Sequence, residues 1–357
     1  MKPARPIPYL KVKGSAYELG FQHGRAFDQR IRTMSAQSLA WVERTAGVAR
    51  ADLLSRVRQY VPFVEEATPY LIEEVRGIAD GAAIPFEETF ALQARFELVY
   101  TPAPECTVFG AAAERTRDGK VMIGQNMDLP PEDEENIILL HLVPNDGRPE
   151  ILTATVCGIL SQEGINSAGL ALCGSLVVSR NWRVGYPNRN FLRRFILEQQ
   201  DIPAALRAIE RVPHRAAGHH LVLADAAGRI IDLEQTPDTY RTFGPEQGIL
   251  AHANHYLHPD LVPEEGLHDA NPRLYRGSVR RRNRMRQLLE AHEGPLDVES
   301  LHAILSDHGD GPETICAHAG EHSESKTVIS VVAIPQERTL WVGLGNPCES
   351  GMKPYFL

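Results

Sequence analysis

Residues 101–128 read TPAPECTVFGAAAERTRDGKVMIGQNMD, and the character of the chain changes within this stretch. Thr101–Pro104 holds two prolines, which cannot continue a helix, so we predict an extended or turned connector there. Thr107–Ala113 and Val121–Gln125 then read as strands, and the Asp-Gly pair between them is a hairpin turn signal. The stretch therefore predicts a β-hairpin that begins where the proline-rich connector ends, at Cys106.

The residues that precede this connector predict helices. Apolar residues recur at loosely helical spacing in three stretches. These stretches are Ala16–Ala36, Ala51–Ala79 and Glu87–Tyr100. Pro62 and Pro69 are expected to interrupt the second stretch, because proline lacks the amide donor of the helix ladder. The sequence thus predicts a mainly helical N-terminal segment over residues 1–105.

The residues that follow the hairpin predict further strands and a few blocks of helix. The strands are predicted at Ile137–Val143, Glu150–Val156, Gly169–Val178, His220–Ala224, Ile230–Glu234, Val328–Ile334 and Thr339–Gly343. The helices are predicted at Asn190–Val212, with a break near Pro203, and at Arg276–Ala291 and Asp297–Ser306. Short turns between neighbouring strands imply antiparallel sheets, and helices that arrive in blocks imply an α+β fold. No internal repeat or low-complexity linker divides the chain, so one compact domain is predicted.

The charge balance argues against a nucleic-acid partner. The 357 residues carry 37 basic and 46 acidic side chains, a net charge of −9, whereas nucleic-acid binding depends on clustered Lys and Arg. The densest basic run, Arg276–Arg286, reads first as a charged helix face, with one arginine serving a site as the alternative. No apolar run reaches the roughly 18 residues that a membrane span requires. No membrane association is therefore expected.

The cysteines indicate a reducing compartment. There are five of them, widely spread, with no CxxC pair, which suggests neither a disulfide framework nor a structural zinc knuckle. The first residues, MKPARPIPYL, lack the apolar core of a secretory signal. We therefore expect the protein to be cytoplasmic.

Cys106 is a candidate nucleophile because of its position. If the bond before it were cut, its free α-amine would titrate near 7.7–8.0 and could act as a general base toward its own thiol. Asp128 ends the hairpin's second strand, so pairing would return a carboxylate to the side of Cys106. Asn254 offers an amide donor for an oxyanion. Taken singly, a core cysteine, a turn aspartate and a turn or cap asparagine remain the simpler interpretations.

Several motifs occur together in one order along the chain. They are GSAYELGFQHG at 14–24, Cys106-Thr107, GQNMD at 124–128, GINSAGL at 164–170, ANHYL at 253–257, SDH at 306–308, TIC at 314–316 and GNPC at 345–348. In this ordered set the sequence resembles the isopenicillin N acyltransferase family of autoproteolytic cysteine acyltransferases and hydrolases. The resemblance extends over nearly the whole chain.

The resemblance implies a four-layer αββα sandwich of the N-terminal-nucleophile hydrolase type. It implies a precursor that cleaves itself between Glu105 and Cys106, with 106–357 as the catalytic fragment and 1–105 remaining associated. Cys106 would be the nucleophile, Asp128 would position it and Asn254 would bind the oxyanion. The expected substrate is a small acyl amide or thioester, such as an acylated amine, an amino acid or a β-lactam-like amide. No metal or other cofactor is expected.

Two positions depart from the family's pattern. Bile-salt hydrolases and penicillin V acylases, which look like more distant relatives, carry an arginine where Gln125 stands, so bile-salt specificity is not expected. Glu105 replaces the glycine of the penicillin enzyme, and glycine favours the strained backbone that self-cleavage needs. The glutamate either slows cleavage or assists it as an acid, and the sequence does not choose between them.

Other interpretations use the same residues. A papain-like hydrolase would pair Cys106 with His308 and would not cleave itself, although a strand rather than a helix is predicted after the cysteine. A non-catalytic small-molecule binding protein is the second alternative. The histidines 252, 255 and 258 could suggest a metal, but on a strand residues three apart face opposite sides. A second polar cluster matches no zinc signature and reads as a loop beside the site: Asp307, His308, Asp310, Cys316, His318 and His322.

Overall fold

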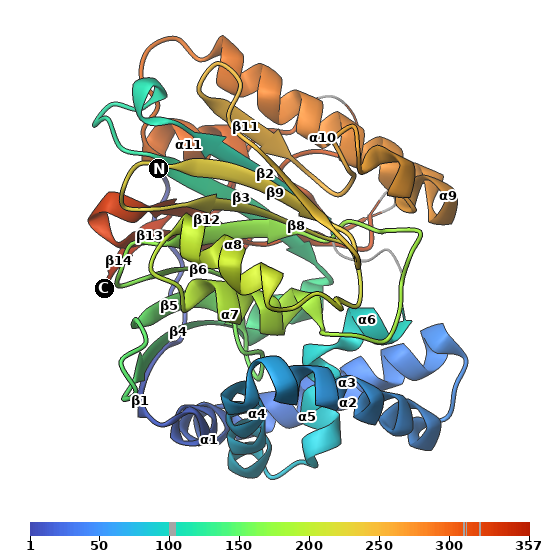
Figure 1. The fold of residues 1–357 in the computed structure, drawn as a ribbon. Coiled ribbons are helices and arrows are strands. Elements are labelled where there is room, and N and C mark those ends of the chain that lie inside the picture. Colours follow the sequence, from blue (N-terminus) through green and yellow to red (C-terminus); the bar gives the residue numbers. More distant parts are fainter. Residues whose placement is uncertain (100–104, 310, 312, 321–322) are drawn as a thin grey trace.

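A computed structural model describes residues 1–99, 105–309, 311, 313–320 and 323–357. Its strands form two sheets (Figure 1). The eight-stranded sheet has, in spatial order, β1 (Tyr9–Gly14), β4 (Ile137–Pro144), β5 (Ile151–Val156), β6 (Glu163–Asn166), β7 (Ala171–Ser175), β8 (His219–Ala224), β9 (Ile230–Gln235) and β10 (Tyr240–Phe243). The six-stranded sheet has β11 (Ile249–His252), β2 (Cys106–Ala111), β3 (Met122–Leu129), β12 (Lys326–Ile334), β13 (Thr339–Leu344) and β14 (Lys353–Phe356).

The helices lie in two groups, one on the outer face of each sheet (Figure 1). The group beside the eight-stranded sheet is α1 (Ala16–Ala26), α2 (Asp28–Ala46), α3 (Arg50–Ala67), α4 (Pro69–Ala82), α5 (Phe86–Gln93), α6 (Arg95–Val99), α7 (Arg193–Leu197) and α8 (Ile202–Glu210). The group beside the six-stranded sheet includes α10 (Pro272–Ala291) and α11 (Val298–Leu305), with α9 (Leu267–Ala270) leading into α10. Short 3-10 or π turns are η1 (Ala113–Arg115), η2 (Pro131–Asn136), η3 (Asn188–Leu192), η4 (Val262–Glu264) and η5 (Pro335–Glu337).

Successive side chains of a strand point to opposite faces of its sheet, so three apolar cores form between four layers. Ile138 on β4 packs with the first helical group, whereas its neighbour Leu139 packs between the sheets. Val108 on β2 likewise faces the space between the sheets, and Phe109 faces the α10 and α11 side. This period of two buries both faces of each sheet. The order helices, sheet, sheet, helices confirms the α+β class and the αββα sandwich.

The hairpin that opens at Cys106 is confirmed. β2 and β3 pair antiparallel, with Cys106 opposite Met127 and Ala111 opposite Met122. The intervening turn has Gly119 at a φ of +63°, a left-handed conformation that glycine adopts without a steric penalty. Cys106 is itself the first residue of the strand. The local sequence therefore fixes where the thiol enters the sheet.

The prolines do not all break helices as predicted. Pro62 lies inside α3, so the prediction of a break there is wrong, because the helix tolerates one missing amide donor where tertiary packing holds its buried face. Pro69 starts α4, as the first-turn preference of proline allows. Near residue 203 the chain does break, but Pro203 itself lies in the first turn of α8, after the cap at Asp201. The predicted connector Thr101–Pro104 and Tyr100 lie outside the described residues.

Five strands were not predicted from the sequence. They are β1, β6, β10, β11 and β14. β1 pairs parallel with β4, so the N-terminal segment adds a strand to the larger sheet before its helices begin. The other sheet pairings are antiparallel, as predicted. The missed strands have four to six residues, too short for a periodicity to stand out.

The motif at residues 14–24 serves packing. A Cβ added to Gly20 on α1 would lie 2.0 Å from the backbone oxygen of Glu74 on α4, so only glycine permits this approach of the two helices. His23 is buried, and its Nε2 accepts a hydrogen bond of 3.0 Å from the backbone N–H of Gly158. Burial lowers the pKa of His23 to about 4. No helix among the described residues is long and apolar enough to cross a bilayer.

Candidate active site

Cys106 lies at the start of β2 with its side chain between the two sheets. Only 1% of the residue is exposed, and it packs in the same core as Val108 and Met127. Its backbone N–H donates a hydrogen bond of 3.0 Å to Oδ1 of Asn254. The structure thus brings together Cys106 and Asn254, which are 148 positions apart in the chain.

Asn254 follows β11, the edge strand that pairs with β2. Its Oδ1 also accepts from Nη2 of Arg281 at 2.9 Å, and its Nδ2 donates to the backbone oxygen of Leu176 at 3.0 Å. Two donors converge on Oδ1, which identifies this atom as the amide oxygen. In the uncut chain, Asn254 therefore presents an acceptor to Cys106. The prediction that its amide donates to an oxyanion stays a prediction.

Asp128 lies on the other side of the same peptide. Its backbone N–H donates a 2.9 Å hydrogen bond to the carbonyl oxygen of Glu105. Its Oδ1 accepts from the hydroxyl of Thr327 at 2.6 Å. Its Oδ2 is buried and has no hydrogen-bond partner in the part of the chain that the structure describes. Burial raises the pKa of Asp128 to about 7, although Arg281 and the Thr327 hydrogen bond oppose that shift.

The thiol of Cys106 is not activated in this environment. Burial raises the pKa of Cys106 to about 12, and the negative charges of Asp128 and Glu163 add to the effect. Arg189 and Arg193 act in the opposite direction. A base or a change in the surroundings must therefore assist the thiol at neutral pH.

Arg189 is a site residue that the sequence analysis missed. It is 2% exposed, and its guanidinium lies 4.3 Å from the centre of the Phe96 ring. Its Nε and Nη1 have no hydrogen-bond partner among the described residues. Burial lowers the pKa of Arg189 to about 10, so it remains a cation at neutral pH. No local motif marks it, since it lies in the η3 turn.

Arg281 is the arginine of the basic run that contacts the candidate site residues. It lies on the face of α10 that packs against the six-stranded sheet, at helical spacing from Ser278 and Met285, which are also buried. Its Nη1 forms an ion pair with the carboxylate of Glu105, while its Nη2 binds Asn254. The basic run is thus a charged face with one inward member, which the sequence analysis had left as the alternative.

Gln125 is uncharged, and Glu163 links it to the buried cation Arg193. Its Nε2 donates to Oε1 of Glu163 at 2.9 Å, and the same oxygen accepts from Nη1 of Arg193 on α7 at 2.6 Å. All three side chains are about 1% exposed. The positive charge near this part of the site therefore comes from a helix of the first group rather than from β3.

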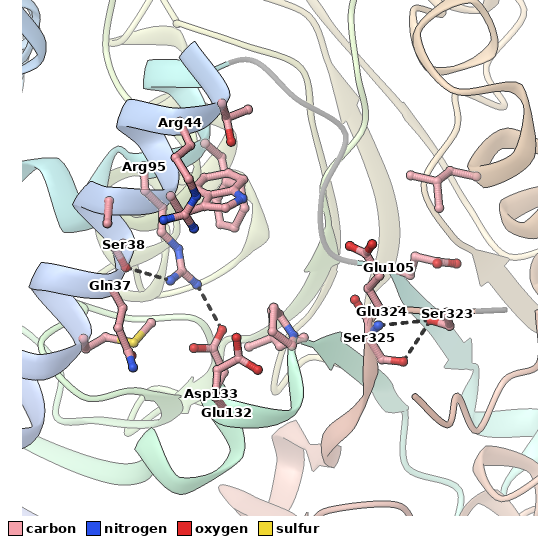
Figure 2. A pocket seen from close by; sticks show the side chains of 18 of the residues that line it. Gln37, Ser38, Arg44, Arg95, Glu105, Glu132, Asp133, Ser323, Glu324 and Ser325 are labelled. Atoms are coloured by element: carbon pink, nitrogen blue, oxygen red, sulfur yellow. Dashed lines mark hydrogen bonds and ion pairs between the residues drawn. The ribbon is translucent and has the colours of Figure 1, made fainter. Parts of the chain in front are cut away.

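A cavity of 680 Å³ opens at the residue before Cys106. Figure 2 shows Glu105 and residues 323–325 on one side of it, and Arg95, between Ser38 and Asp133, on the other. Arg95 and Asp133 approach to 3.7 Å. The rings of Trp41 and Phe96 meet edge to face, with their centres 5.7 Å apart, and give the cavity an aromatic surface. The cavity therefore offers both apolar and charged contacts to a small molecule.

Where the structure describes them, the histidines considered in the sequence analysis have hydrogen-bond partners other than Cys106. Nε2 of His308 lies 3.1 Å from Nε2 of His318, and none of the hydrogen bonds among the described residues joins Cys106 to a histidine. His252 binds Glu234, His255 binds Ser278, and His258 accepts from the amide of Asp260. These last three side chains have separate partners, so they do not converge as a three-histidine metal centre would.

Comparison with known proteins identifies one family. The family model described as acyl-coenzyme A:6-aminopenicillanic acid acyl-transferase matches residues 115–349, which is 235 of 357 residues. The matched span includes Asp128 and Asn254 and begins after Cys106.

Two curated relatives align over most of their length. The acyl-coenzyme A:6-aminopenicillanic-acid-acyltransferase 40 kDa form of Emericella nidulans is 26% identical over 345 residues, which cover 95% of this chain and 93% of that protein. The beta-alanyl-dopamine/carcinine hydrolase of Drosophila melanogaster is 20% identical over 377 residues, which cover 96% of this chain and 94% of that protein.

Two solved structures are similar at lower identity. A variant of conjugated bile acid hydrolase from Clostridium perfringens matches with a TM-score of 0.46 and 15% identity, covering 70% of this chain and 97% of that one. Penicillin V acylase from Agrobacterium tumefaciens matches with a TM-score of 0.43 and 13% identity, covering 67% and 83%.

Proposed function

Because this chain belongs to the acyl-coenzyme A:6-aminopenicillanic acid acyl-transferase family, we propose that it is a cysteine amidohydrolase or acyltransferase that matures by cutting itself before Cys106. One observation carries the proposal. The Glu105–Cys106 peptide is bound at both ends, its carbonyl oxygen by the amide of Asp128 and its N–H by Asn254. A peptide bond held in this way is prepared for attack by the adjacent thiol.

The first step is an acyl shift within the chain. The Sγ of Cys106 attacks the carbonyl carbon of Glu105 while the unpartnered Oδ2 of Asp128 takes the thiol proton and passes it to the leaving nitrogen. The C–N bond breaks, and a thioester forms with a free amine on Cys106. The Asp128 N–H stabilises the oxyanion that develops on the Glu105 carbonyl. Water then cleaves the thioester, which releases the carboxyl group of Glu105 and restores the thiol.

The new α-amine gives the thiol a base of its own for turnover. Oδ1 of Asn254 already accepts from this nitrogen, and the unpartnered Oδ2 of Asp128 is a candidate acceptor for an added proton. An ammonium beside Asp128 would lower the pKa of that carboxyl below its value in the uncut chain. Cleavage thereby converts an inert thiol into a nucleophile with its own base.

Turnover proceeds through an acyl-enzyme. The thiolate attacks the carbonyl of a small acyl amide or thioester, the α-amine protonates the leaving group, and Asn254 with a backbone N–H binds the oxyanion. Water or an acceptor amine then removes the acyl group. The aromatic and charged lining of the cavity suits a small amphipathic substrate, and the two curated relatives are named for acyl transfer and for hydrolysis. Fragments 1–105 and 106–357 stay associated, because β1 pairs with β4.

Intact mass under denaturing conditions tests the proposal. Cleavage before Cys106 splits 39.6 kDa into about 12 kDa (105 of 357 residues) and about 28 kDa (252 of 357), in proportion to length. The wild type should give both fragments, with Cys106 at the N-terminus of the larger, and Cys106→Ala should stay uncut. A wild type that is uncut yet hydrolyses acyl amides would overturn the free-amine mechanism and favour a papain-like one. Activity retained in Cys106→Ala would favour a different site altogether.

A further inference from the structure

Four side chains from two loops, the α11–β12 loop and the β13–β14 loop, meet at one end of the six-stranded sheet. His308 follows α11, Cys316 and His318 precede β12, and Cys348 follows β13. Their spacing along the chain matches no zinc motif, which is why the sequence analysis expected no metal here. In the folded chain, one nitrogen or sulfur atom from each of the four lies within 4.8 Å of the others. The group is called here the loop cluster.

The distances within the loop cluster fit a tetrahedral ion. Nε2 of His318 lies 3.1 Å from Nε2 of His308, 3.7 Å from Sγ of Cys316 and 3.4 Å from Sγ of Cys348. Zinc bonds of about 2.0–2.1 Å to nitrogen and 2.3 Å to sulfur place tetrahedral ligand atoms roughly 3.3–3.8 Å apart. Two cysteines and two histidines are also the ligand set that soft tetrahedral sites use. The geometry therefore needs little adjustment to hold one ion.

The surroundings also suit bound thiolates. Nδ2 of Asn346 approaches Sγ of Cys316 at 3.5 Å, and such outer contacts commonly orient metal ligands. Cys316 is fully buried, while His308 is exposed and gives an ion a route from solvent. A divalent cation deprotonates a thiol that coordinates it, so both cysteines can bind as thiolates.

We propose that His308, Cys316, His318 and Cys348 bind one Zn²⁺ ion in a structural site. Two thiolates and two neutral imidazoles balance the ion's charge, and each zinc bound releases two thiol protons. All four protein ligands complete the tetrahedron, which distinguishes the site from a catalytic zinc with an open position. The proposal is independent of the reaction proposed for Cys106.

The ion would stiffen the segment that holds Asp128. Ala317, between two of the ligands, donates its N–H to Oγ1 of Thr327 at 3.0 Å. The hydroxyl of Thr327 in turn donates to Oδ1 of Asp128 at 2.6 Å. Asn346 also donates to the backbone oxygen of Ala317 at 2.6 Å. The zinc would therefore tie the two loops together next to a positioning residue of the proposed active site.

Metal content and cobalt substitution test the site. The full chain is purified, reduced under nitrogen, stripped with a chelator and reconstituted with Zn²⁺ or Co²⁺. We expect about one Zn²⁺ per chain, and with Co²⁺ the intense thiolate-to-metal absorption and tetrahedral bands of an S₂N₂ site. Cys348→Ser should weaken zinc binding more than about 100-fold, since loss of an outer contact alone costs about 10- to 100-fold.

The controls separate this result from folding defects and from a disulfide. Cys157→Ser removes a buried cysteine outside the loop cluster and should keep full metal content. The cobalt spectrum of the wild type supports the site even if Cys316→Ser fails to fold. Reduced wild-type protein that takes up neither Zn²⁺ nor Co²⁺ would overturn the proposal. This includes the case in which Cys316 and Cys348 are first isolated as a disulfide and bind no ion after reduction. Metal uptake does not depend on self-cleavage, so Cys106→Ala should bind zinc as the wild type does.

Discussion

Cys106 and Cys316 are both buried thiols near the six-stranded sheet, and burial raises the pKa of each to about 12. Their neighbours differ. Cys106 packs in an apolar core, where the charges of Asp128 and Arg189 act on it, whereas Cys316 lies beside His318 and Cys348. Burial by itself makes a thiol inert, so its chemistry depends on what can stabilise the thiolate. A new amine would do so at Cys106, and a metal ion at Cys316.

The two regions also differ in how each is assembled. The Cys106 region is assembled around one peptide bond, which accepts a hydrogen bond from β3 and donates one to the segment after β11. The loop cluster is assembled from side chains on loops and has two exposed members, His308 and His318. They are connected through Ala317, Thr327 and Asp128. Variants should therefore affect the two regions separately, except along this connection.

The largest expected effect is that of Cys106→Ala. It removes the nucleophile, so self-cleavage should be abolished and acyl-amide turnover should fall by at least about 10⁴-fold. Intact mass and steady-state kinetics measure the two effects. The same substitution at Cys316 should leave a protein that still cleaves itself but lacks metal. If Cys316→Ala abolished cleavage in a folded protein while Cys106→Ala cleaved normally, the assignment of roles would be reversed.

Asn254→Ala should come next in size. Loss of an oxyanion donor costs about 10²–10³-fold in kcat, and here the variant also removes the acceptor for the Cys106 nitrogen. Both the cleavage rate and kcat should therefore fall while the fold is retained. Asn254→Asp keeps an acceptor but loses the amide donor, so it separates the two functions. Wild-type turnover in both variants would remove Asn254 from the mechanism.

Asp128 should make the stability of the uncut chain depend on pH. Its folded pKa of about 7 lies above its ordinary value of 3.8, so the folded chain binds this proton more tightly than the unfolded chain. The contribution to stability is complete below about pH 4 and is lost as pH rises through 7. At roughly 3 pKa units and 1.36 kcal/mol per unit, the loss is about 4 kcal/mol at most.

Chemical denaturation of the Cys106→Ala chain at pH 5 and pH 8 measures this effect. The free energy of unfolding should fall toward pH 8, and the added substitution Asp128→Asn should flatten that fall. Equal pH dependence in the single and double variants would show that another group is responsible. Zinc content should be the same in both, because Asp128 is not a proposed ligand.

The smallest effect is expected at Glu105. Its carboxylate pairs with Arg281, and replacement by glutamine should slow self-cleavage by only about tenfold, the equivalent of about 1.4 kcal/mol. Glu105→Gly tests the alternative that the glutamate hinders cleavage, because glycine eases backbone strain. Faster cleavage in the glycine variant would assign a braking role to Glu105. Slower cleavage in both variants would assign an anchoring role to Glu105. Mass spectrometry over time measures the cleavage of each variant.

Much of the fold could be predicted from the sequence because its signals are local. The hairpin from Cys106 to Asp128 depends on a turn and on alternation within one short stretch, so its strands and the place of the cysteine were predicted correctly. The helix break at Pro62 was wrong, since tertiary packing overrides the preference of a single residue. Short strands such as β6 gave no usable period.

The sequence by itself determined the layered α+β fold, the position of Cys106 at a strand start and the return of Asp128 beside it. Only the tertiary structure decided that Arg281 turns inward to Glu105, that the charge of Arg189 acts on the thiol and that the loop cluster forms. The physical reason is distance along the chain. Turn geometry and strand alternation act between near neighbours, whereas these contacts join residues that meet only when helices pack on sheets and loops converge at a sheet edge.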